Sequence, residues 1–269
     1  MNLTGNTILI TGGGSGIGRS LAEAFHHAGN RVIVAGRRKY ALDEVVAANP
    51  GIESAALDIQ SPDSVAAFAG DIVRRFPDLN VLINNAGIMK SEDLNDPDSD
   101  FAIVEATIQT NLIAPLRLTA ALLPHLKQRP DAVIMTVSSG LAFLPLAMTP
   151  TYCATKAAIH SWTQSLRYQL QGTGVRVIEI IPPYVQTELM GSHQRRDPRA
   201  MPLADFTSEV MEILRTRPGA TEICVQRVNH LRFAAEQGQE KYEEIFQGLN
   251  NATRAAAAER HTVAPTLRS

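Results

Sequence analysis

The sequence has few cysteines, no long apolar run and no large excess of positive or negative charge. Each of these features excludes a class of protein. Only two cysteines, Cys153 and Cys224, occur among the 269 residues, so a secreted fold built on a disulfide framework is excluded. No apolar run approaches the roughly 18–20 residues that a membrane span needs, and the N-terminus lacks the features of a signal peptide. We therefore expect a cytoplasmic protein without a membrane partner.

The charged residues nearly balance one another. Lys+Arg 25 and Asp+Glu 27 leave a formal net charge of -2 at pH 7, which argues against a nucleic-acid partner because such proteins normally carry a basic surface. The histidines are scattered without the spacing of metal ligands, so we predict no metal site. They are His26, His27, His125, His160, His193, His230 and His261.

Short β-branched segments alternate with longer helical segments from the start of the chain. Strands are expected over residues 7–11, 31–35, 52–57, 81–84, 132–137, 175–181 and 222–225. Helices are expected over residues 15–28, 39–48, 61–76, 101–126 and 152–170, with Pro115 and Pro124 kinking or fraying the long fourth one. Strands separated by helices predict a parallel sheet covered on both faces. The expected class is α/β, a three-layer Rossmann fold with a doubly wound parallel sheet of about seven strands flanked by helices.

The first strand leads into a glycine-rich turn. Its sequence over residues 11–18 is TGGGSGIG. Ligands of parallel sheets bind beyond the carboxyl ends of the strands, and glycines there allow a tight turn and a close approach of the backbone to a phosphate. The strict GxGxxG spacing is not present. The segment is a candidate dinucleotide-binding turn, and an ordinary glycine-rich connection is the alternative.

The second strand ends in cations instead of the usual carboxylate. Arg37, Arg38 and Lys39 stand where NAD-binding proteins usually have an acid for the ribose 2′-hydroxyl. Cations suit a 2′-phosphate, and Arg37 is the expected direct contact. The alternative is a solvated basic start of the next helix. We predict that NADP(H) is preferred over NAD(H).

Two further strand ends carry polar or small residues. Asp58 and Ile59 follow the third strand, where Asp58 is placed to meet an adenine edge. Asn85, Ala86 and Gly87 follow the fourth strand and permit a close approach of a cofactor. Each signal is weak by itself, because such residues are also routine in turns.

The strongest pattern is a serine pair after the fifth strand, followed by a tyrosine and a lysine. Ser138 and Ser139 precede Tyr152 and Lys156, and the last two project from one helical face because they are four residues apart. A free tyrosine titrates near pH ~10, and a nearby ammonium together with an oxidised nicotinamide would lower the pKa of the phenol. A surface tyrosine–lysine pair on an amphipathic helix is the alternative.

In their order along the chain, these motifs resemble the short-chain dehydrogenase/reductase family over roughly residues 5–190. The family's serine lies 13 residues before its tyrosine, which selects Ser139, and its helix asparagine falls on Asn111. No composition break occurs before about residue 250, so we expect residues 1–250 to form a single dinucleotide-binding and catalytic domain. The small and polar segment 251–269 is expected to be a flexible C-terminal tail.

The resemblance implies a role for each motif residue. In the family the tyrosine exchanges a proton with the substrate, the serine hydrogen-bonds the substrate oxygen, and the lysine binds the nicotinamide ribose and lowers the pKa of the tyrosine. These catalytic roles fall on Tyr152, Ser139 and Lys156, and a water-linked proton relay falls on Asn111. Hydride moves between nicotinamide C4 and the carbonyl carbon. The implied cofactor-binding set is Gly12, Gly14, Ser15, Gly16, Ile17, Gly18, Arg37, Arg38, Asp58, Ile59, Asn85, Ala86, Gly87, Tyr152, Lys156, Pro182, Val185 and Thr187.

Two segments depart from the family's pattern. The usual Pro-Gly after the sixth strand is Pro182-Pro183 here, although Thr187 remains available to the nicotinamide carboxamide. Residues 222–225 stand in place of the usual glycine-rich final strand. These features resemble a bacterial branch named for a teichoic-acid D-alanylation operon.

Apolar side chains surround the expected substrate position. The predicted substrate-binding residues are Ser139, Leu141, Phe143, Tyr184, Leu189 and Met190. Such a pocket favours medium-sized or aryl ketones over sugars or highly charged acids, although core packing is an alternative for several of these side chains. The charged loop of residues 195–199 lies at the expected lid, where it is either solvated or in contact with a substrate or phosphate.

These residues predict an NADPH-dependent carbonyl reductase, the reverse of an alcohol dehydrogenase, acting on a small-molecule ketone or secondary alcohol. The alternative is a non-enzymatic NADP(H)-binding sensor or assembly partner. Such proteins commonly lose the tyrosine or the lysine, and this chain has both Tyr152 and Lys156. The resemblance also implies a homodimer or homotetramer, paired through the helices expected over residues 101–126 and 152–170.

Overall fold

Buried aliphatic residues form the strands of one sheet in the computed structural model, which describes residues 2–97 and 100–263. Every residue of β1 (Thr7–Thr11) is buried. Its side chains alternate, so that Ile8 and Ile10 enter the core on one face of the sheet and Leu9 enters the core on the other. A strand that is apolar on both faces is what a sheet covered by two layers of helices requires.

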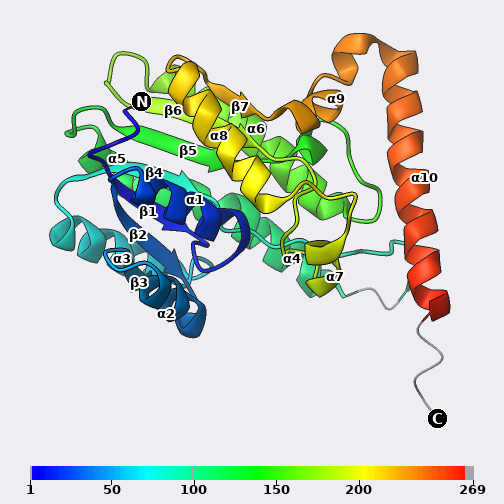
Figure 1. Cartoon of the computed structure of the whole chain (residues 1–269), viewed down its shortest axis with the longest axis horizontal. Helices are drawn as coiled ribbons and strands as arrows, with labels where there is room; N and C mark the ends of the chain where they lie inside the picture. Colours follow the sequence, from blue (N-terminus) through cyan, green and yellow to red (C-terminus); the bar gives the residue numbers. More distant parts are fainter. Residues whose placement is uncertain (1, 98–99, 264–269) are drawn as a thin grey trace.

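The sheet is parallel and has the strand order β3-β2-β1-β4-β5-β6-β7 (Figure 1). The remaining strands are β2 (Arg31–Gly36), β3 (Glu53–Ala56), β4 (Leu79–Asn84), β5 (Val133–Val137), β6 (Arg176–Ile181) and β7 (Glu222–Cys224). From β1 the chain first adds β2 and β3 on one side and then adds β4 to β7 on the other, so that the switch point lies between β1 and β4. Open α/β sheets bind ligands at this switch point. The α/β fold class with a seven-stranded sheet is confirmed.

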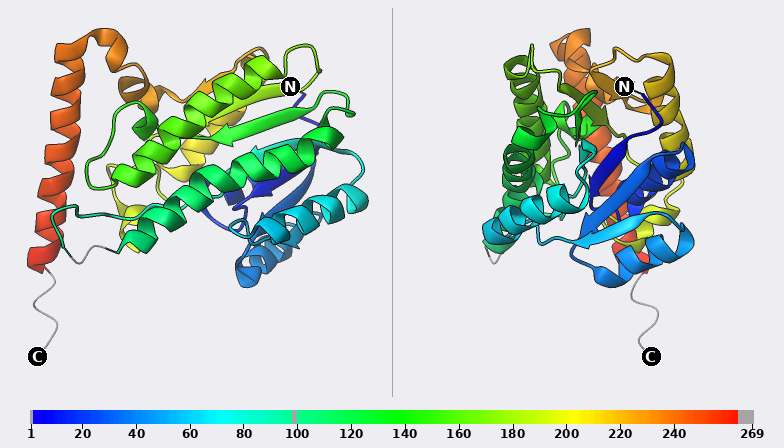
Figure 2. Two further views of the ribbon diagram at one scale, coloured as in Figure 1. Left: turned by 180° about the vertical axis from the view of Figure 1, so that it is seen from behind. Right: turned by 90° about the vertical axis from the view of Figure 1, so that its left-hand side faces the viewer.

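Helices cover the two faces of the sheet in separate layers, which Figure 2 shows from behind and from the side. The side chains of α1 (Gly16–His27), α2 (Lys39–Ala48) and α8 (Leu203–Thr216) belong to one core. Those of α3 (Pro62–Arg75), α5 (Ala114–Leu126) and α6 (Pro150–Gln169) belong to the other. None of the helices in the described ranges is long and apolar enough to cross a membrane.

The helix predicted over residues 101–126 is interrupted. It consists of α4 (Phe101–Ile108), one wide π-helical turn (Gln109–Ile113) and α5. Pro115 explains the position of the interruption, because proline has no N–H to donate to the carbonyl of Asn111 and its ring crowds that carbonyl. Pro124 lies inside α5, which nevertheless continues to Leu126.

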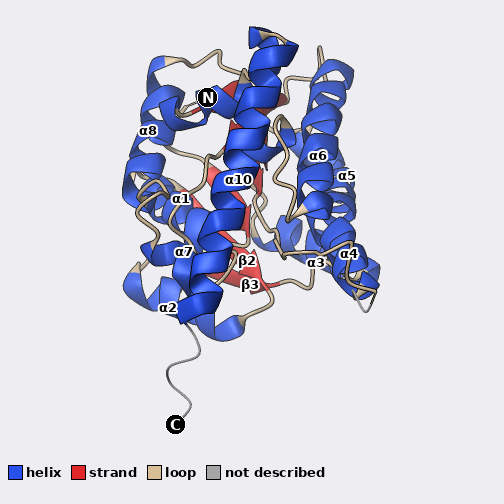
Figure 3. Ribbon diagram, turned by 90° about the vertical axis from the view of Figure 1, so that its right-hand side faces the viewer, coloured by secondary structure: helices blue, strands red, loops and turns tan. Residues whose placement is uncertain are grey.

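The C-terminal segment differs from the prediction. The expected boundary at residue 250 falls inside α10 (Gln239–Val263), which runs without interruption across it. Figure 3 shows α10 crossing in front of the carboxyl edge of the sheet. Residues 251–263 of the predicted tail continue this helix, and residues 264–269 lie outside the described part of the chain. Apolar residues on one face of the helix before residue 250 pack against α9 (Asn229–Arg232) and its neighbours. They are Tyr242, Ile245, Phe246 and Leu249.

Candidate active site

A cavity of about 800 Å³ opens at the carboxyl edge of the sheet and brings together most of the predicted site residues. Those that line it are Gly12, Gly14, Ser15, Gly16, Ile17, Arg37, Arg38, Ile59, Asn85, Ala86, Gly87, Ser139, Leu141, Tyr152, Lys156, Pro182, Tyr184, Val185, Thr187, Leu189 and Met190. Four predicted residues, Gly18, Asp58, Asn111 and Phe143, are not among the lining residues.

The glycine turn packs backbone against backbone with the loop after β4. Gly12 has a φ of 68°, and a Cβ there would lie 2.9 Å from the Cα of Ala86. A Cβ on Gly18 would overlap the Asn85 side chain and the carbonyl oxygen of Gly12. Asn85 donates from Nδ2 to the carbonyl of Thr11 at 2.9 Å. Gly18 therefore serves this close packing from outside the cavity, whereas Gly12 lies on its wall.

The cations after β2 do not all reach the cavity. Arg37 Nη1 donates to Oε1 of Gln60 at 3.4 Å, and Arg38 Nη2 donates to Oγ of Ser15 at 2.9 Å. Lys39 instead pairs with Asp43 at 2.6 Å and is not a lining residue. The alternative of a solvated helix start thus describes Lys39, while both arginines face the cavity.

Asp58 is placed differently from the prediction. Its carboxylate accepts a hydrogen bond from the backbone N of Gln60 at 3.1 Å, and its own backbone N donates to Oγ of Ser64. The residue is used within the turn that leads into α3, and its neighbour Ile59 lines the cavity instead. An aspartate that bonds the backbone two residues later forms a common turn, which is the local reason for this placement.

Tyr152 and Ser139 meet inside the cavity. Tyr152 is buried in the first turns of α6, and Ser139 is buried just after β5. Burial raises the pKa of Tyr152 above its usual value, and the hydrogen bond with the Ser139 side chain acts in the opposite direction. The phenol is therefore protonated at neutral pH, with a second hydroxyl beside it.

Lys156 lies one helical turn from Tyr152. Its Nζ is 5.5 Å from the centre of the Tyr152 ring and donates to the carbonyl of Val137 at 2.7 Å. Burial lowers the pKa of Lys156 to about 8, and the negative charge of Glu179 on β6 opposes this shift. Glu179 is fully buried and is bonded to Nδ1 of His160 at 2.8 Å.

Asn111 occupies the wide turn between α4 and α5, behind the cavity wall. Its Oδ1 accepts from the backbone N of Ile88 at 2.8 Å, and its Nδ2 donates to the carbonyl of the same residue at 2.8 Å. Gly87 lies between the Asn111 side chain and Lys156, since a Cβ on Gly87 would lie 3.3 Å from Oδ1 and 3.8 Å from Nζ. Asn111 thus holds the loop after β4 beside the lysine.

Comparison with known proteins agrees with this geometry. A family model described as short chain dehydrogenase matches residues 6–198. The chain belongs to the short chain dehydrogenase family. It is 40% identical over 253 residues to the uncharacterized oxidoreductase DltE of Bacillus subtilis (strain 168), covering 93% of this chain and 98% of that one. The predicted family and the resemblance to that bacterial branch are confirmed, and the protein is an oxidoreductase of this family.

Two solved structures of the short chain dehydrogenase fold contain nicotinamide cofactors. A short chain dehydrogenase from Burkholderia cenocepacia J2315, in complex with NADP, has a TM-score of 0.72 and 28% identity, over 96% of this chain and 98% of that one. The 3-ketoacyl-(acyl-carrier-protein) reductase from Brucella melitensis, complexed with NADH, has a TM-score of 0.73 and 25% identity, over 84% of this chain and 100% of that one. Related proteins of the family therefore bind either cofactor.

Phe143 does not take the predicted substrate position. Its ring packs edge-on against His160, with centroids 4.6 Å apart, and the guanidinium of Arg232 lies 4.4 Å from its centre. The short 3₁₀ turn Gly140–Ala142 leaves Leu141 on the cavity wall, whereas Phe143, just after it, packs against His160 and Arg232 instead. Apolar character alone could not distinguish the two side chains, because the difference depends on this turn.

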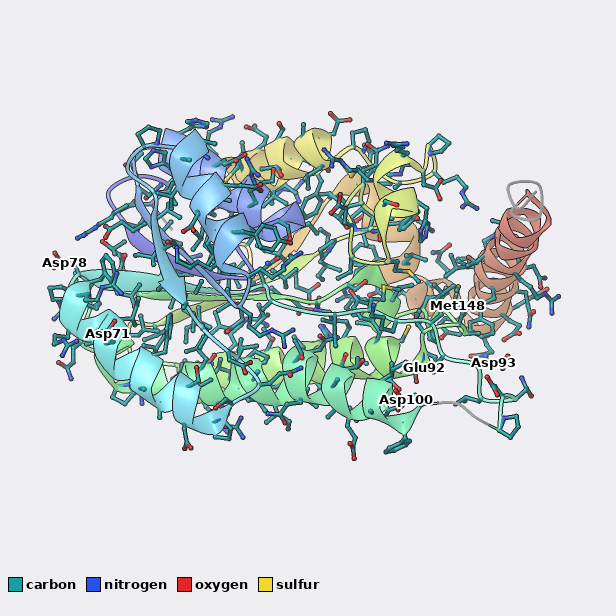
Figure 4. All side chains as sticks on the ribbon, turned by 90° about the horizontal axis from the view of Figure 1, so that it is seen from below. Asp71, Asp78, Glu92, Asp93, Asp100 and Met148 are labelled. Atoms are coloured by element: carbon teal, nitrogen blue, oxygen red, sulfur yellow. The ribbon has the colours of Figure 1, made fainter. Side chains whose placement is uncertain are left out.

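Three residues on the substrate side of the cavity were not predicted from the sequence. Leu249, Ala252 and Thr253 of α10 line the cavity, at the spacing of one helical face. Met148 also lines it, and Figure 4 shows Met148 beside Glu92 of the loop after β4. The backbone N of Glu92 donates to the carbonyl of Met148 at 2.9 Å. Predicting a helix that continues across residue 250 would have identified Leu249, Ala252 and Thr253.

Asn250 joins α10 to the loop before α6. Its Oδ1 accepts from the backbone N of Ala147 at 2.7 Å, and its Nδ2 donates to the carbonyl of Pro145 at 3.2 Å. We expect Asn250→Ala to increase amide hydrogen exchange in α10 and at residues 145–149 by about 30-fold, because the two lost bonds are worth about 1 kcal/mol each. The exposed neighbour Asn251 provides the control: Asn251→Ala should leave these rates unchanged. Equal protection from exchange in both variants would contradict this role of the Asn250 hydrogen bonds.

One cluster has the composition of a metal site although none was predicted. Ligand atoms of His160, Glu179 and Glu222 lie within 4.8 Å of one another. The three residues come from α6, β6 and β7, so their sequence spacing could not reveal the cluster. Glu222 is already held by Arg232, which donates to it at 2.8 and 3.2 Å. The guanidinium thus supplies positive charge beside the two carboxylates.

Proposed function

We propose that this oxidoreductase is an NADPH-dependent carbonyl reductase, equivalent in reverse to an alcohol dehydrogenase. The main observation in support is that Tyr152, Ser139 and Lys156 line the same cavity as the glycine turn. The substrate class is a ketone or secondary alcohol. Leu141, Leu189 and the other apolar lining residues support a medium-sized or aryl body for that substrate.

The residues of the cavity fit a phosphorylated dinucleotide. The Gly12 backbone has no room for a side chain beside Ala86, which is typical of a turn that a pyrophosphate approaches. Within the described ranges no carboxylate pairs with Arg37 or Arg38, so both guanidinium groups can hold a 2′-phosphate. Thr187 and Lys156 would hold the nicotinamide end. When bound, the cofactor supplies the hydride.

The protein's own side chains supply the proton and orient the substrate. Tyr152, protonated because burial raises its pKa, would donate its proton to the substrate oxygen as that oxygen gains charge. Ser139 would hold the same oxygen by a hydrogen bond. The ammonium of Lys156 stabilises the resulting phenolate, and Asn111, which fixes the neighbouring loop, would support the return of a proton through water.

The direct test is the loss of reduced-nicotinamide absorbance with a panel of aryl and aliphatic ketones. Turnover with NADPH is the expected result. Binding of NADPH without turnover of any ketone would favour the non-enzymatic sensor instead. We place the reaction in the cytoplasm, the reducing compartment that the free cysteines favour, and in a homodimer or homotetramer, for which sedimentation provides the test.

Cofactor preference is predicted to depend on Arg37. Arg37→Gln should lower kcat/KM for NADPH by about tenfold and leave the value for NADH nearly unchanged, because only NADPH carries the 2′-phosphate. Lys39→Gln is the matched control, since Lys39 belongs to the same basic segment but pairs with Asp43 outside the cavity. Equal losses with both cofactors would refute a specific contact between Arg37 and the 2′-phosphate.

A further inference from the structure

The charges on the cavity wall are strongly unequal, although the whole chain has a net charge of -2. The basic side chains on the wall are Arg37, Arg38, Lys90, Lys156, His193, Arg199, Arg227 and His230. Among the described lining residues the single carboxylate is Glu188, and it pairs with Arg195 at 3.2 Å. Arg37, Arg38 and Lys156 are accounted for by the cofactor. The basic side chains on the substrate side are not.

Arg227 and His230 lie at the opposite end of the sheet from the predicted 2′-phosphate site. Arg37 follows β2, next to the β3 edge, whereas Arg227 follows β7, which is the other edge strand. The short helical segments that carry Arg227 and His230 place residues three apart on one face. The Arg227 and His230 side chains are therefore separate from the adenosine end of the cavity.

The same segment packs directly beside the catalytic serine. Gly140 follows Ser139, and a Cβ on Gly140 would lie 2.7 Å from the side chain of Val228 and 2.8 Å from that of Leu231. Leu231 also lines the cavity. The backbone that presents Arg227 and His230 is thus fixed against the turn that presents Ser139.

The Arg227 guanidinium is positioned without being neutralised. Its Nη2 donates to the carbonyl oxygen of Arg199 at 2.7 Å, and no carboxylate pairs with it in the described part of the chain. Arg199 binds Asp197 through two nitrogens, at 3.0 and 2.6 Å, which fixes that carbonyl. The bonds from Arg199 lower the pKa of Asp197 to about 2, so the carboxylate is charged and already engaged.

We infer that Arg227 and His230 bind an anionic group, a carboxylate or phosphate ester, at the end of the substrate remote from its carbonyl. The inference rests on the proposed reductase function and refines its substrate: an apolar body against Leu141, Met148 and Leu231, with an anionic group at its end. Arginine suits planar or tetrahedral oxyanions because its fork donates two parallel hydrogen bonds. Because the other walls are apolar, we still expect a sugar or a highly charged acid to be a poor substrate.

The test compares oxo acids of increasing chain length with their methyl esters, under NADPH and at low ionic strength. At the best chain length, kcat/KM for the acid should exceed that for the ester by about tenfold, mainly through a lower KM, and added salt should reduce the difference. An oxoalkyl phosphate of the same length distinguishes the two oxyanions: whichever of the acid and the phosphate has the lower KM identifies the group.

Variants separate this inference from the proposed function. Arg227→Gln should reduce kcat/KM for the acid to the level of the ester and leave the ester and the Kd of NADPH unchanged. Arg217→Gln, at an exposed arginine outside the cavity, is the control and should change neither. If the ketone of the methyl esters is reduced as well as that of the acids, or if Arg227→Gln weakens NADPH binding instead, the anion site is refuted. If no ketone is reduced in any of these compounds although NADPH binds, the reductase function itself fails.

Discussion

Tyr152→Phe is expected to lower kcat for ketone reduction by about 10²–10⁴-fold at pH 7, the range that a positioned general acid contributes. The substitution removes the proton donor and keeps the ring, which is buried in the first turns of α6. The glycine turn and Arg37 are untouched by it, so the Kd of NADPH should stay within about twofold. The loss of NADPH absorbance during turnover measures kcat. Quenching or energy transfer of nicotinamide fluorescence measures the Kd of NADPH.

Tyr168→Phe is the matched control for this experiment. Tyr168 lies on the same helix, α6, but its side chain is 73% exposed and does not line the cavity. Its variant should retain the parent kcat. Ketone reduction by Tyr152→Phe at the parent rate would show that another group protonates the substrate oxygen. A large loss of kcat in Tyr168→Phe would instead indicate that α6 tolerates no substitution. The loss in Tyr152→Phe could then not be assigned to the missing proton donor.

The sheet and the glycine turn could be predicted because their signals are local. A buried strand such as β1 has apolar residues on both faces, and the turn after it needs glycine where Gly12 approaches Ala86. Tyr152 and Lys156 share a helical face by spacing alone. The choice of Ser139 came from family resemblance, and the cavity contains Ser139 on its wall.

Features that depend on tertiary contacts could not be predicted in the same way. Leu141 and Phe143 are both apolar and two residues apart, but only Leu141 lines the cavity because a 3₁₀ turn separates their directions. Arg227 is positioned by a hydrogen bond to the carbonyl of Arg199, 28 residues earlier in the chain. The helix α10 is an exception, since Tyr242, Ile245, Phe246 and Leu249 show the spacing of an amphipathic helix, and this pattern was overlooked.

Lys156→Met is expected to change activity and stability in opposite directions. Loss of the ammonium beside Tyr152 should reduce kcat by about 10²-fold or more, because the phenolate loses its nearby positive charge. The free energy of unfolding without cofactor should nevertheless rise at pH 7. Burial makes the charged lysine costly in the folded state, and methionine fills a similar volume without a charge.

The pH dependence follows from the direction of the pKa shift. The pKa of Lys156 is lowered from 10.5 to about 8 in the folded protein, so between these values the unfolded chain binds more protons and stability rises with pH. The free-energy cost of burying the charged Lys156 is therefore largest below about pH 8, and it decreases as the pH rises towards 10.5. A shift of this size corresponds to about 3 kcal/mol, from which the lost hydrogen bond to Val137 removes about 1 kcal/mol.

Urea unfolding of the cofactor-free protein at pH 7 and pH 9.5 tests this argument. We expect Lys156→Met to be more stable than the parent by about 1–2 kcal/mol at pH 7, and the difference to shrink at pH 9.5. Lys127→Met, at an exposed lysine, should differ little from the parent at either pH. A Lys156→Met protein that is less stable at pH 7 would mean that the bond to Val137 and the charge of Glu179 outweigh burial. The lysine would then stabilise the fold as well as the phenolate.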